Sequence, residues 1–315
     1  MENVGRELNK LIDQRNYRAR FQEMMAEVLA NPEVKSFIDE NKDYLTEMDI
    51  EKSYAKLYEF VQEKRKFDAQ DQRMIAPGYE PQLILNFHSI DVTYVPTQDL
   101  LARKHQEEVR NRIHAVNMPK DIQDARISNY EGTTGRGEAL MASIDFIESY
   151  TANPKQFHKG LYLVGSFGIG KTYLLGAIAR DLAEAGYSTT LLHFPTFAVE
   201  MKQAIGKDLV GEKLNEIKNA PVLMLDDIGA DAMSSWIRDE VFGVILQHRM
   251  QEQLPTFFSS NFTMLELERH LSVTQRGEEE PLKAKRIMER IRYLTKEIEM
   301  TGKNRRNQSR GGLTQ

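Results

Sequence analysis

The chain contains no cysteine among its 315 residues. This absence excludes disulfides, thiolate nucleophiles and cysteine-ligated zinc, and it suits a reducing compartment. No stretch approaches the roughly 18 consecutive apolar residues that a membrane helix needs. The first segment, MENVGRELNKLIDQRNYRAR, lacks the apolar core of a signal peptide. We therefore expect a cytoplasmic protein with no membrane partner.

A large excess of positive charge is also missing. The formal net charge is −5 and the pI is near 5.9, so the chain as a whole is not a basic nucleic-acid coat, although local basic patches are compatible with these values. Hydrophobic residues make up 41% and charged residues 28%, which is typical of globular proteins. The length suffices for two domains with sizeable cores.

The first part of the chain is predicted to be mainly helical. Residues 5–66 carry apolar side chains at spacings of three and four, and Asn31 followed by Pro32 predicts a new helix start. Pro-Gly at 77–78 ends this pattern. The segments LILNF and IDVTYV, separated by HS, predict a β-hairpin, and residues 99–116 are expected to form a charged helix.

Strand and helix patterns alternate in the second part of the chain. The predicted strands are GLYLVG, STTLLHF, PVLMLDD and LPTFFSSN, each followed by a helical pattern. This alternation indicates an α/β fold, with a parallel sheet covered by helices on both faces. Residues 281–300 are predicted to form a basic amphipathic helix. The expected domains are an N-terminal domain at 1–116, a connector at 117–137, an α/β domain at 138–308 and a flexible tail at 309–315.

The segment GSFGIGKT lies between a predicted strand and a predicted helix and fits the pattern G-x-x-x-x-G-K-[ST]. Its glycines allow backbone N–H groups to point at phosphate oxygens, and the helix N-terminus favours the anion. Lys171 is expected to bind the β- and γ-phosphates, and the Thr172 hydroxyl to ligate Mg²⁺. The predicted nucleotide-binding residues are Gly165, Ser166, Phe167, Gly168, Ile169, Gly170, Lys171 and Thr172.

Polar side chains end two of the other predicted strands. Asp226 and Asp227 follow PVLML, and Asn261 follows PTFFSS. Ligands of open α/β sheets bind at the carboxyl ends of the strands. We expect Asp226 to orient the metal ion and Asp227 to polarise the attacking water as a general base. Asn261 is expected to align that water or contact the γ-phosphate. The alternative is a structural role, because Asn is common in the turn that follows a strand.

Two groups of arginines are further candidates for phosphate contacts. Arg286 and Arg290 are four residues apart on one face of the basic helix, and Arg305 and Arg306 follow it. A guanidinium suits bidentate contact with phosphate. A solvated basic helix is the alternative.

Taken in order, the loop, LMLDDIGAD, WIRDEV, LPTFFSSNF and RIMERIRYL…GKNRR resemble the AAA+ ATPases. More closely, the chain resembles the bacterial replicative helicase loaders of the DnaI type, which are related to DnaC. The resemblance makes residues 165–172 Walker A and Asp226 and Asp227 Walker B. It also makes Asn261 sensor 1, Arg290 the arginine finger with Arg286 as the alternative, and Arg306 the sensor 2 residue with Arg305 as the alternative.

The chain departs from related sequences at two points. Many AAA+ proteins carry Asp-Glu in Walker B, whereas this chain has Asp-Asp; the shorter Asp227 is consistent with a slow, switch-like ATPase. Several relatives carry a cysteine-ligated zinc in the N-terminal domain. Without cysteine, zinc is not expected here, and the hairpin is expected to be held by apolar packing alone.

The resemblance implies a function in DNA replication, in the primosome. We expect the N-terminal domain to bind the hexameric replicative DNA helicase. The AAA+ domain is expected to bind ATP and single-stranded DNA. An arginine finger acts in trans, so self-association through the AAA+ domain and slow, partner-stimulated ATPase activity are also expected. The alternatives are a transposase-helper ATPase of the insertion-sequence type, a small-molecule kinase, and an interaction module that binds nucleotide without turnover.

Overall fold

The computed structural model describes residues 20–119, 122, 124–132 and 135–304. The chain divides into two compact units, Met1–His105 and Gln106–Gln315. Within the described residues, no helix combines the length and the apolar character that crossing a membrane requires.

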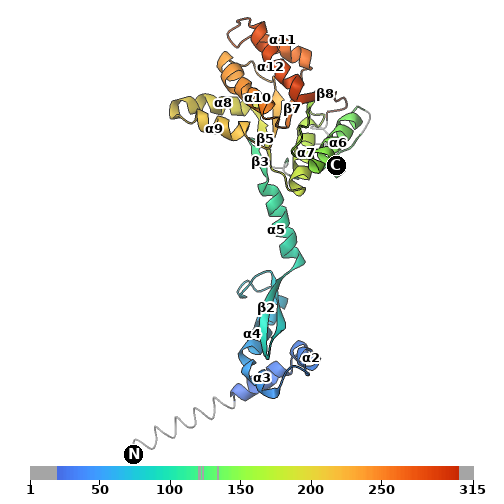
Figure 1. Ribbon diagram of the computed structural model, residues 1–315, viewed down its shortest axis with the longest axis vertical. Helices are drawn as coiled ribbons and strands as arrows, with labels where there is room; N and C mark the ends of the chain where they lie inside the picture. Colours follow the sequence, from blue (N-terminus) through green and yellow to red (C-terminus); the bar gives the residue numbers. More distant parts are fainter. Residues whose placement is uncertain (1–19, 120–121, 123, 133–134, 305–315) are drawn as a thin grey trace, which may run out of the picture. The chain divides into compact units, whose positions relative to one another are not determined.

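The first unit contains short helices and a two-stranded sheet (Figure 1). Residues 20–29 are helical. Asn31 caps the next helix, because its side chain accepts hydrogen bonds from the backbone N–H groups of Glu33 and Val34 at 3.0 and 3.3 Å. The elements that follow are α2 (Pro32–Glu40), α3 (Glu47–Lys52), α4 (Tyr54–Asp68), β1 (Tyr79–Asn86) and β2 (Ser89–Pro96), and α5 (Gln98–Asn111) crosses into the second unit.

The predicted hairpin is present, since β1 and β2 pair antiparallel from Tyr79↔Pro96 to Asn86↔Ser89. Phe87 and His88 form the turn, in which Phe87 has a φ of 53° and is 90% exposed. The predicted helical stretch 5–66 is divided into separate helices where the structure describes it, and residues 5–19 lie outside the described residues.

The expectation that apolar packing alone holds the hairpin is wrong. An apolar core does exist, and it includes Leu57, Phe60, Val61 and Ile90. Polar contacts also join the hairpin to the helices. Lys64 Nζ of α4 donates to Glu80 of β1 at 2.6 Å, and the Ser53 hydroxyl accepts the N–H of Ile90 at 2.8 Å. These contacts satisfy backbone and charged groups that packing would leave unpaired.

The second unit is built on a six-stranded parallel sheet with the order β3-β5-β6-β7-β4-β8. Its strands are β3 (Ile113–Val116), β4 (Gly160–Val164), β5 (Thr189–His193), β6 (Val222–Ile228), β7 (Thr256–Ser260) and β8 (Thr295–Glu299). Its helices are η2 (Ile127–Asn129), α6 (Gly137–Ala152), α7 (Lys171–Glu184), α8 (Phe194–Ala204), η3 (Ile205–Lys207), α9 (Val210–Lys218), η4 (Ile237–Phe242), α10 (Gly243–Gln251), α11 (Met264–Ser272) and α12 (Pro281–Leu294).

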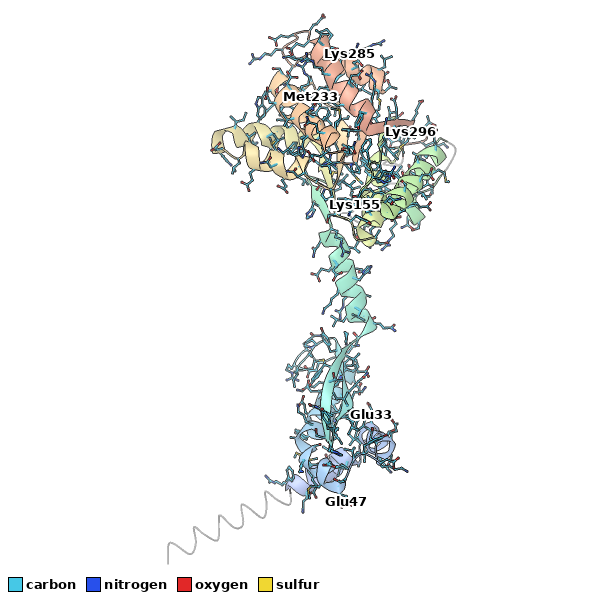
Figure 2. All side chains as sticks on the ribbon, viewed as in Figure 1. Glu33, Glu47, Lys155, Met233, Lys285 and Lys296 are labelled. Atoms are coloured by element: carbon cyan, nitrogen blue, oxygen red, sulfur yellow. The ribbon has the colours of Figure 1, made fainter. Side chains whose placement is uncertain are left out.

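Successive residues of the strands face two different cores. In β6, Leu223 and Leu225 pack with helices α8 to α12, whereas Val222 and Met224 pack with α6 and α7. The alternation follows from the two-residue period of a strand. Both faces of the sheet are therefore covered, as the apolar strands predicted, and Figure 1 shows the two groups of helices on either side. Charged side chains such as Lys285 and Lys296 are exposed on this unit (Figure 2).

Two predicted helices end earlier than expected, and a strand follows each. The helix predicted at 99–116 ends at Asn111, and residues 113–116 form β3, which pairs with β5. This strand lies within the range predicted for the N-terminal domain, yet it belongs to the sheet of the second unit. The helix predicted at 281–300 ends at Leu294, where β8 begins to pair with β4. Tertiary pairing overrides helix propensity in both segments.

Candidate nucleotide-binding site

The loop at 165–170 joins β4 to α7 and depends on its glycines. Gly165, Gly168 and Gly170 have φ values of 152°, 75° and 99°, which residues with side chains rarely adopt. A side chain at Gly165 would also collide with the backbone, because its Cβ would lie 2.2 Å from the Met300 carbonyl oxygen. Ile169 is 1% exposed and anchors the loop in the core. The loop therefore holds its backbone at the N-terminus of α7, where an anion is favoured.

Lys171 begins α7 and is 7% exposed. Its Nζ donates to the carbonyl oxygens of Gly165 and Ser166 at 2.6 and 2.9 Å and to Asn261 Oδ1 at 2.8 Å. The ammonium thus lies between the loop and the carboxyl end of β7. These three acceptors are neutral, so a phosphate oxygen would be a stronger partner for the charge.

Thr172 and Asp226 meet across the site. The Thr172 hydroxyl donates to Asp226, with oxygen–oxygen distances of 2.9 and 3.1 Å to the two carboxylate oxygens. The Ser259 hydroxyl also donates to Asp226, at 2.5 Å. Asp226 is 4% exposed, and this burial raises the pKa of its carboxyl group, although the hydrogen bonds from Ser259 and Thr172 act in the opposite direction.

Asp227 adopts an unusual backbone conformation, with a φ of 60° for a residue that is not glycine. Its backbone N–H donates to the Ser259 hydroxyl at 2.9 Å. Its carboxylate accepts a hydrogen bond from Asn261 Nδ2 at 3.2 Å. Asn261 therefore contacts both Lys171 and Asp227, and the side chain is half-buried between them.

These residues fit a nucleotide-bound Mg²⁺ ion, because Mg²⁺ prefers oxygen ligands in octahedral geometry and keeps several waters. The Thr172 hydroxyl and the Asp226 carboxylate supply adjacent oxygens beside the phosphate loop. Among the described residues, no group of three or more His, Asp or Glu side chains is placed to hold a metal ion. Phosphate oxygens and water would therefore supply the remaining ligands.

The predicted arginines are not brought to this cluster. Arg290 is half-buried, and its Nη1 donates to the Gly243 carbonyl oxygen at 2.8 Å. Burial and the neighbouring Arg286 lower the pKa of Arg290. Arg286 is exposed. Within the part of the chain that the structure describes, no contact joins either guanidinium to the phosphate loop, and Arg305 and Arg306 lie outside that part.

Two residues at the site were missed from the sequence. Ser259 bonds to both aspartates, and the only sequence signal was its place two residues before Asn261 at the end of a strand. Asn304 lies against the phosphate loop: a Cβ at Gly168 would be 2.1 Å from its Oδ1. Asn304 follows β8, whose residues were predicted to be helical. No pattern in the neighbouring sequence therefore indicated this contact.

The parallel sheet, the glycine loop before α7 and the acidic end of β6 together define a P-loop ATPase of the AAA+ class. The chain matches two family models. Residues 1–94 match the N-terminus of the primosomal protein DnaI, and residues 89–311 match the IstB-like ATP binding protein family.

Relatives and solved structures agree with these matches. The replicative helicase loader DnaI of Bacillus subtilis (strain 168) is 39% identical over 312 residues, which cover 98% of this chain and 100% of the relative. A crystal structure of DnaI is 47% identical and covers 63% of this chain and 99% of that one, with a TM-score of 0.54. The DnaC helicase loader, at 22% identity and a TM-score of 0.50 over 58% of this chain and 100% of its own, shares the fold.

The chain belongs to the DnaI family of replicative helicase loaders. The match extends over both units, so the family assignment does not rest on the ATPase fold alone.

Proposed function

We propose that this protein is an ATP-dependent loader that places the replicative DNA helicase on DNA during initiation or restart of replication. One observation supports the ATP-dependent part. Hydrogen bonds at the carboxyl edge of the sheet join Lys171, Asn261 and Asp227 and also Thr172 and Asp226, and Ser259 links the two groups. The first unit would bind the hexameric helicase, and the second would bind ATP and single-stranded DNA. The helicase and DNA roles rest on membership of the family.

In the proposed site, each side chain has a separate task. Backbone N–H groups of residues 165–170 would surround the phosphates, and Lys171 would exchange its neutral acceptors for β- and γ-phosphate oxygens. Thr172 and Asp226 would hold the Mg²⁺ ion, the latter through water. The bound ion would neutralise charge on the β- and γ-phosphate oxygens.

Hydrolysis requires a polarised water in line with the γ-phosphate. Asp227 would accept the proton of this water, and Asn261, which already contacts Asp227 and Lys171, would align it. Asp227 is one methylene shorter than a glutamate, so its reach to the water would be shorter. We therefore propose slow ATP hydrolysis that the helicase or DNA stimulates.

The test compares steady-state ATP hydrolysis by the wild type, Lys171→Ala and Asp227→Asn, with and without helicase and single-stranded DNA. We expect Lys171→Ala to weaken nucleotide binding about a hundredfold, because an ammonium–phosphate contact is lost. Asp227→Asn should keep binding and lose about 100- to 10,000-fold in rate, the usual contribution of a general base. Equal background rates in all three proteins would contradict the proposal and favour a module that binds without turnover.

The arginine roles need a mixing experiment. We propose Arg290 as the group that acts on the site of a neighbouring subunit, with Arg286 on the same helix face as the alternative and Arg306 as sensor 2. Arg290→Ala should bind ATP but not hydrolyse it, and mixing it with Asp227→Asn should restore part of the activity. If only Arg286→Ala is rescued in this way, Arg286 is the finger. If neither variant is rescued, neither Arg286 nor Arg290 acts across an interface.

A transposase-helper ATPase is the second candidate, because the ATPase unit matches the IstB-like family. The match of residues 1–94 to the DnaI N-terminus favours the loader. Co-purification from the source cell in the presence of ATP separates the two. Recovery of a transposase instead of the replicative helicase would overturn our choice.

A further inference from the structure

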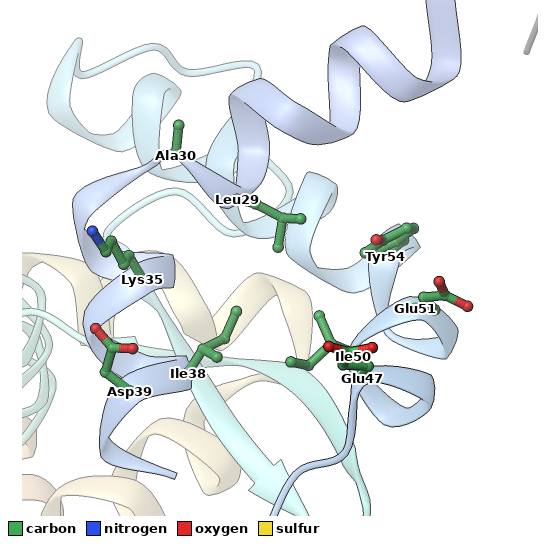
Figure 3. Close-up of a pocket in the computed structure, with 9 residues that line it drawn as sticks. All are labelled: Leu29, Ala30, Lys35, Ile38, Asp39, Glu47, Ile50, Glu51 and Tyr54. Carbon is green, nitrogen blue, oxygen red and sulfur yellow. The ribbon is translucent and has the colours of Figure 1, made fainter. Parts of the chain in front are cut away.

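The first unit contains a pocket of about 550 Å³ between its helices. Leu29, Ile38, Ile50 and Tyr54 form an apolar lining, and each is half-buried. Figure 3 shows Leu29, Ile38 and Ile50 pointing toward the middle of the pocket from different segments. Half-buried aliphatic side chains that face a shared space are a surface to which another apolar group can bind.

The rim of this pocket is charged and predominantly acidic. Lys35 and Asp39 lie on α2, and Glu47 and Glu51 lie on α3, on the opposite side of the pocket (Figure 3). All four side chains are exposed, and Glu47 is seen at the surface of the unit in Figure 2. Three carboxylates and one ammonium give the rim a net charge of −2.

The rim side chains have no ionic partner among the described residues of the first unit. Within the described part of the chain, none of the four side chains forms an ion pair or a side-chain hydrogen bond. Other carboxylates of the same unit are paired, namely Glu33 and Glu80 with Lys64, Glu59 and Asp91 with Lys56, and Glu63 with Lys66. Asp39, Glu47 and Glu51 are therefore unpaired with respect to residues 20–105, which leaves their carboxylates open to a cation of a partner.

The apolar surface continues beyond the pocket. The rings of Phe21 and Tyr54 lie 6.3 Å apart, and Phe21 is 41% exposed. Met48, between Glu47 and Ile50 on α3, is 63% exposed. Exposed Met and aromatic side chains around an apolar pocket are typical of protein-binding surfaces. An acidic rim repels phosphate, so the same features disfavour a nucleic acid.

We propose that this pocket, defined by Leu29, Lys35, Ile38, Asp39, Glu47, Ile50, Glu51 and Tyr54, binds an amphipathic helix of a protein partner. The apolar face of that helix fills the pocket, and Lys or Arg residues beside that face pair with Asp39, Glu47 and Glu51. This inference rests on the proposed function, in which the first unit binds the replicative helicase, so the helix belongs to the helicase.

The test reverses two rim charges without weakening the helices. Asp39 is next to the last residue of α2, and Glu51 is next to the last residue of α3, so a lysine is favoured at both positions by the helix dipole. The matched control is Asp68→Lys/Glu107→Lys, which changes the net charge equally at exposed positions outside the pocket. Each full-length protein is titrated against the helicase encoded in the same genome, with circular dichroism as a check of folding.

We expect Asp39→Lys/Glu51→Lys to weaken helicase binding at least tenfold and the control to change it less than twofold. Added salt should reduce the difference between them, because the rim is exposed. If wild type binds and the reversed variant binds equally, the pocket proposal is wrong while the loader function stands. If the wild type does not bind the helicase, both the pocket proposal and the proposed loader function are wrong. A changed self-association in sedimentation velocity, with helicase binding unaltered, would make the pocket a contact between copies and also overturn the proposal.

Discussion

The two units of this protein place their charged side chains differently. In the first unit most ion pairs lie at or near the surface, such as Lys56 with Asp91, whose side chains are 45% and 40% exposed, and the buried Glu63 is the exception. In the second unit several charged side chains are almost inaccessible: Arg249 is 0%, Asp226 4% and Lys171 7% exposed. These three side chains lie in or beside the parallel sheet.

This contrast follows from what a buried charge requires. Removing a charge from water is costly unless hydrogen bonds replace the lost hydration. Exposed pairs in the first unit avoid this cost and contribute little each. In the second unit, Asp226 and Lys171 each have hydrogen-bond partners that hold them at the phosphate loop. Burial there produces a site with fixed charges, which is what phosphate binding needs.

We expect the greatest loss of stability when a buried charged side chain with a structural role is removed. Arg249 on α10 donates to the carbonyl oxygens of Lys218, Ala220 and Pro255 and to the Thr256 hydroxyl, at 2.6–3.1 Å. Burial lowers the pKa of Arg249 to about 9, so the group is still charged at pH 7. Arg249→Ala should lower the free energy of unfolding by about 3–5 kcal/mol, because it leaves a cavity and unpaired carbonyl groups.

Urea unfolding, monitored by tryptophan fluorescence, measures the stability of the second unit alone. The chain has one tryptophan, Trp236, which packs against the core of the second unit. Arg249→Met is the control that keeps most of the volume, and it should cost less than Arg249→Ala. Equal stability of Arg249→Ala and wild type would show that the buried guanidinium adds nothing to folding.

The second effect is a loss of nucleotide affinity when the buried ammonium of the site is removed. Lys171→Ala should weaken nucleotide binding about a hundredfold, or about 2.8 kcal/mol, because an ammonium–phosphate contact is lost. Titration with a fluorescent nucleotide measures it. Lys207→Ala, which removes an exposed lysine of the same unit, should leave the affinity unchanged. Similar affinities for both variants would exclude Lys171 from phosphate binding.

A smaller effect is expected in the first unit at its buried carboxylate, Glu63, which is 3% exposed. Burial alone would raise the pKa of Glu63, but hydrogen bonds from Lys66 and from the Ile75 N–H, both 2.6 Å long, outweigh it and lower the pKa. Glu63→Ala should cost about 2 kcal/mol at pH 7, because two hydrogen bonds to a charged group are lost, one from Lys66 and one from the Ile75 N–H.

The pH dependence of this effect has a definite sign. A lowered folded-state pKa stabilises the protein above the ordinary value of 4.5, and the contribution disappears as the pH falls through the folded value. The difference between wild type and Glu63→Ala should therefore shrink in acid. Far-UV circular dichroism should detect the change while Trp236 fluorescence does not. A shift of the Trp236 transition instead would mean that the two units do not unfold separately.

The smallest effect is at the surface. Asn31→Ala removes the cap of α2 and should cost about 1 kcal/mol, whereas Asn31→Asp keeps an acceptor and should restore most of it. Thermal unfolding by circular dichroism measures both. If the alanine and aspartate variants are equally stable, the Asn31 side chain does not contribute to the stability of the helix.

Features with local causes could be predicted from the sequence. The glycines of residues 165–172 predicted the phosphate loop because only glycine readily adopts the backbone conformation found at Gly168 and Gly170. The apolar strands predicted a covered parallel sheet, and the carboxyl-edge rule brought Asp226, Asp227 and Asn261 together. The cap at Asn31 and the hairpin followed from short patterns of the same kind.

Features that depend on distant partners could not be predicted in this way and were found in the folded chain. Residues 113–116 and 295–299 form strands because they pair with β5 and β4. The residues next to them in the sequence do not indicate this pairing. The roles of Ser259 and Asn304 beside the site arise in the same way. Lys64 is paired, whereas Glu51 at the pocket rim has no ionic partner among the described residues, and this difference also depends on what the folded chain places beside each charge. Local conformation is set by neighbours in sequence, whereas pairing and burial are set by neighbours in space.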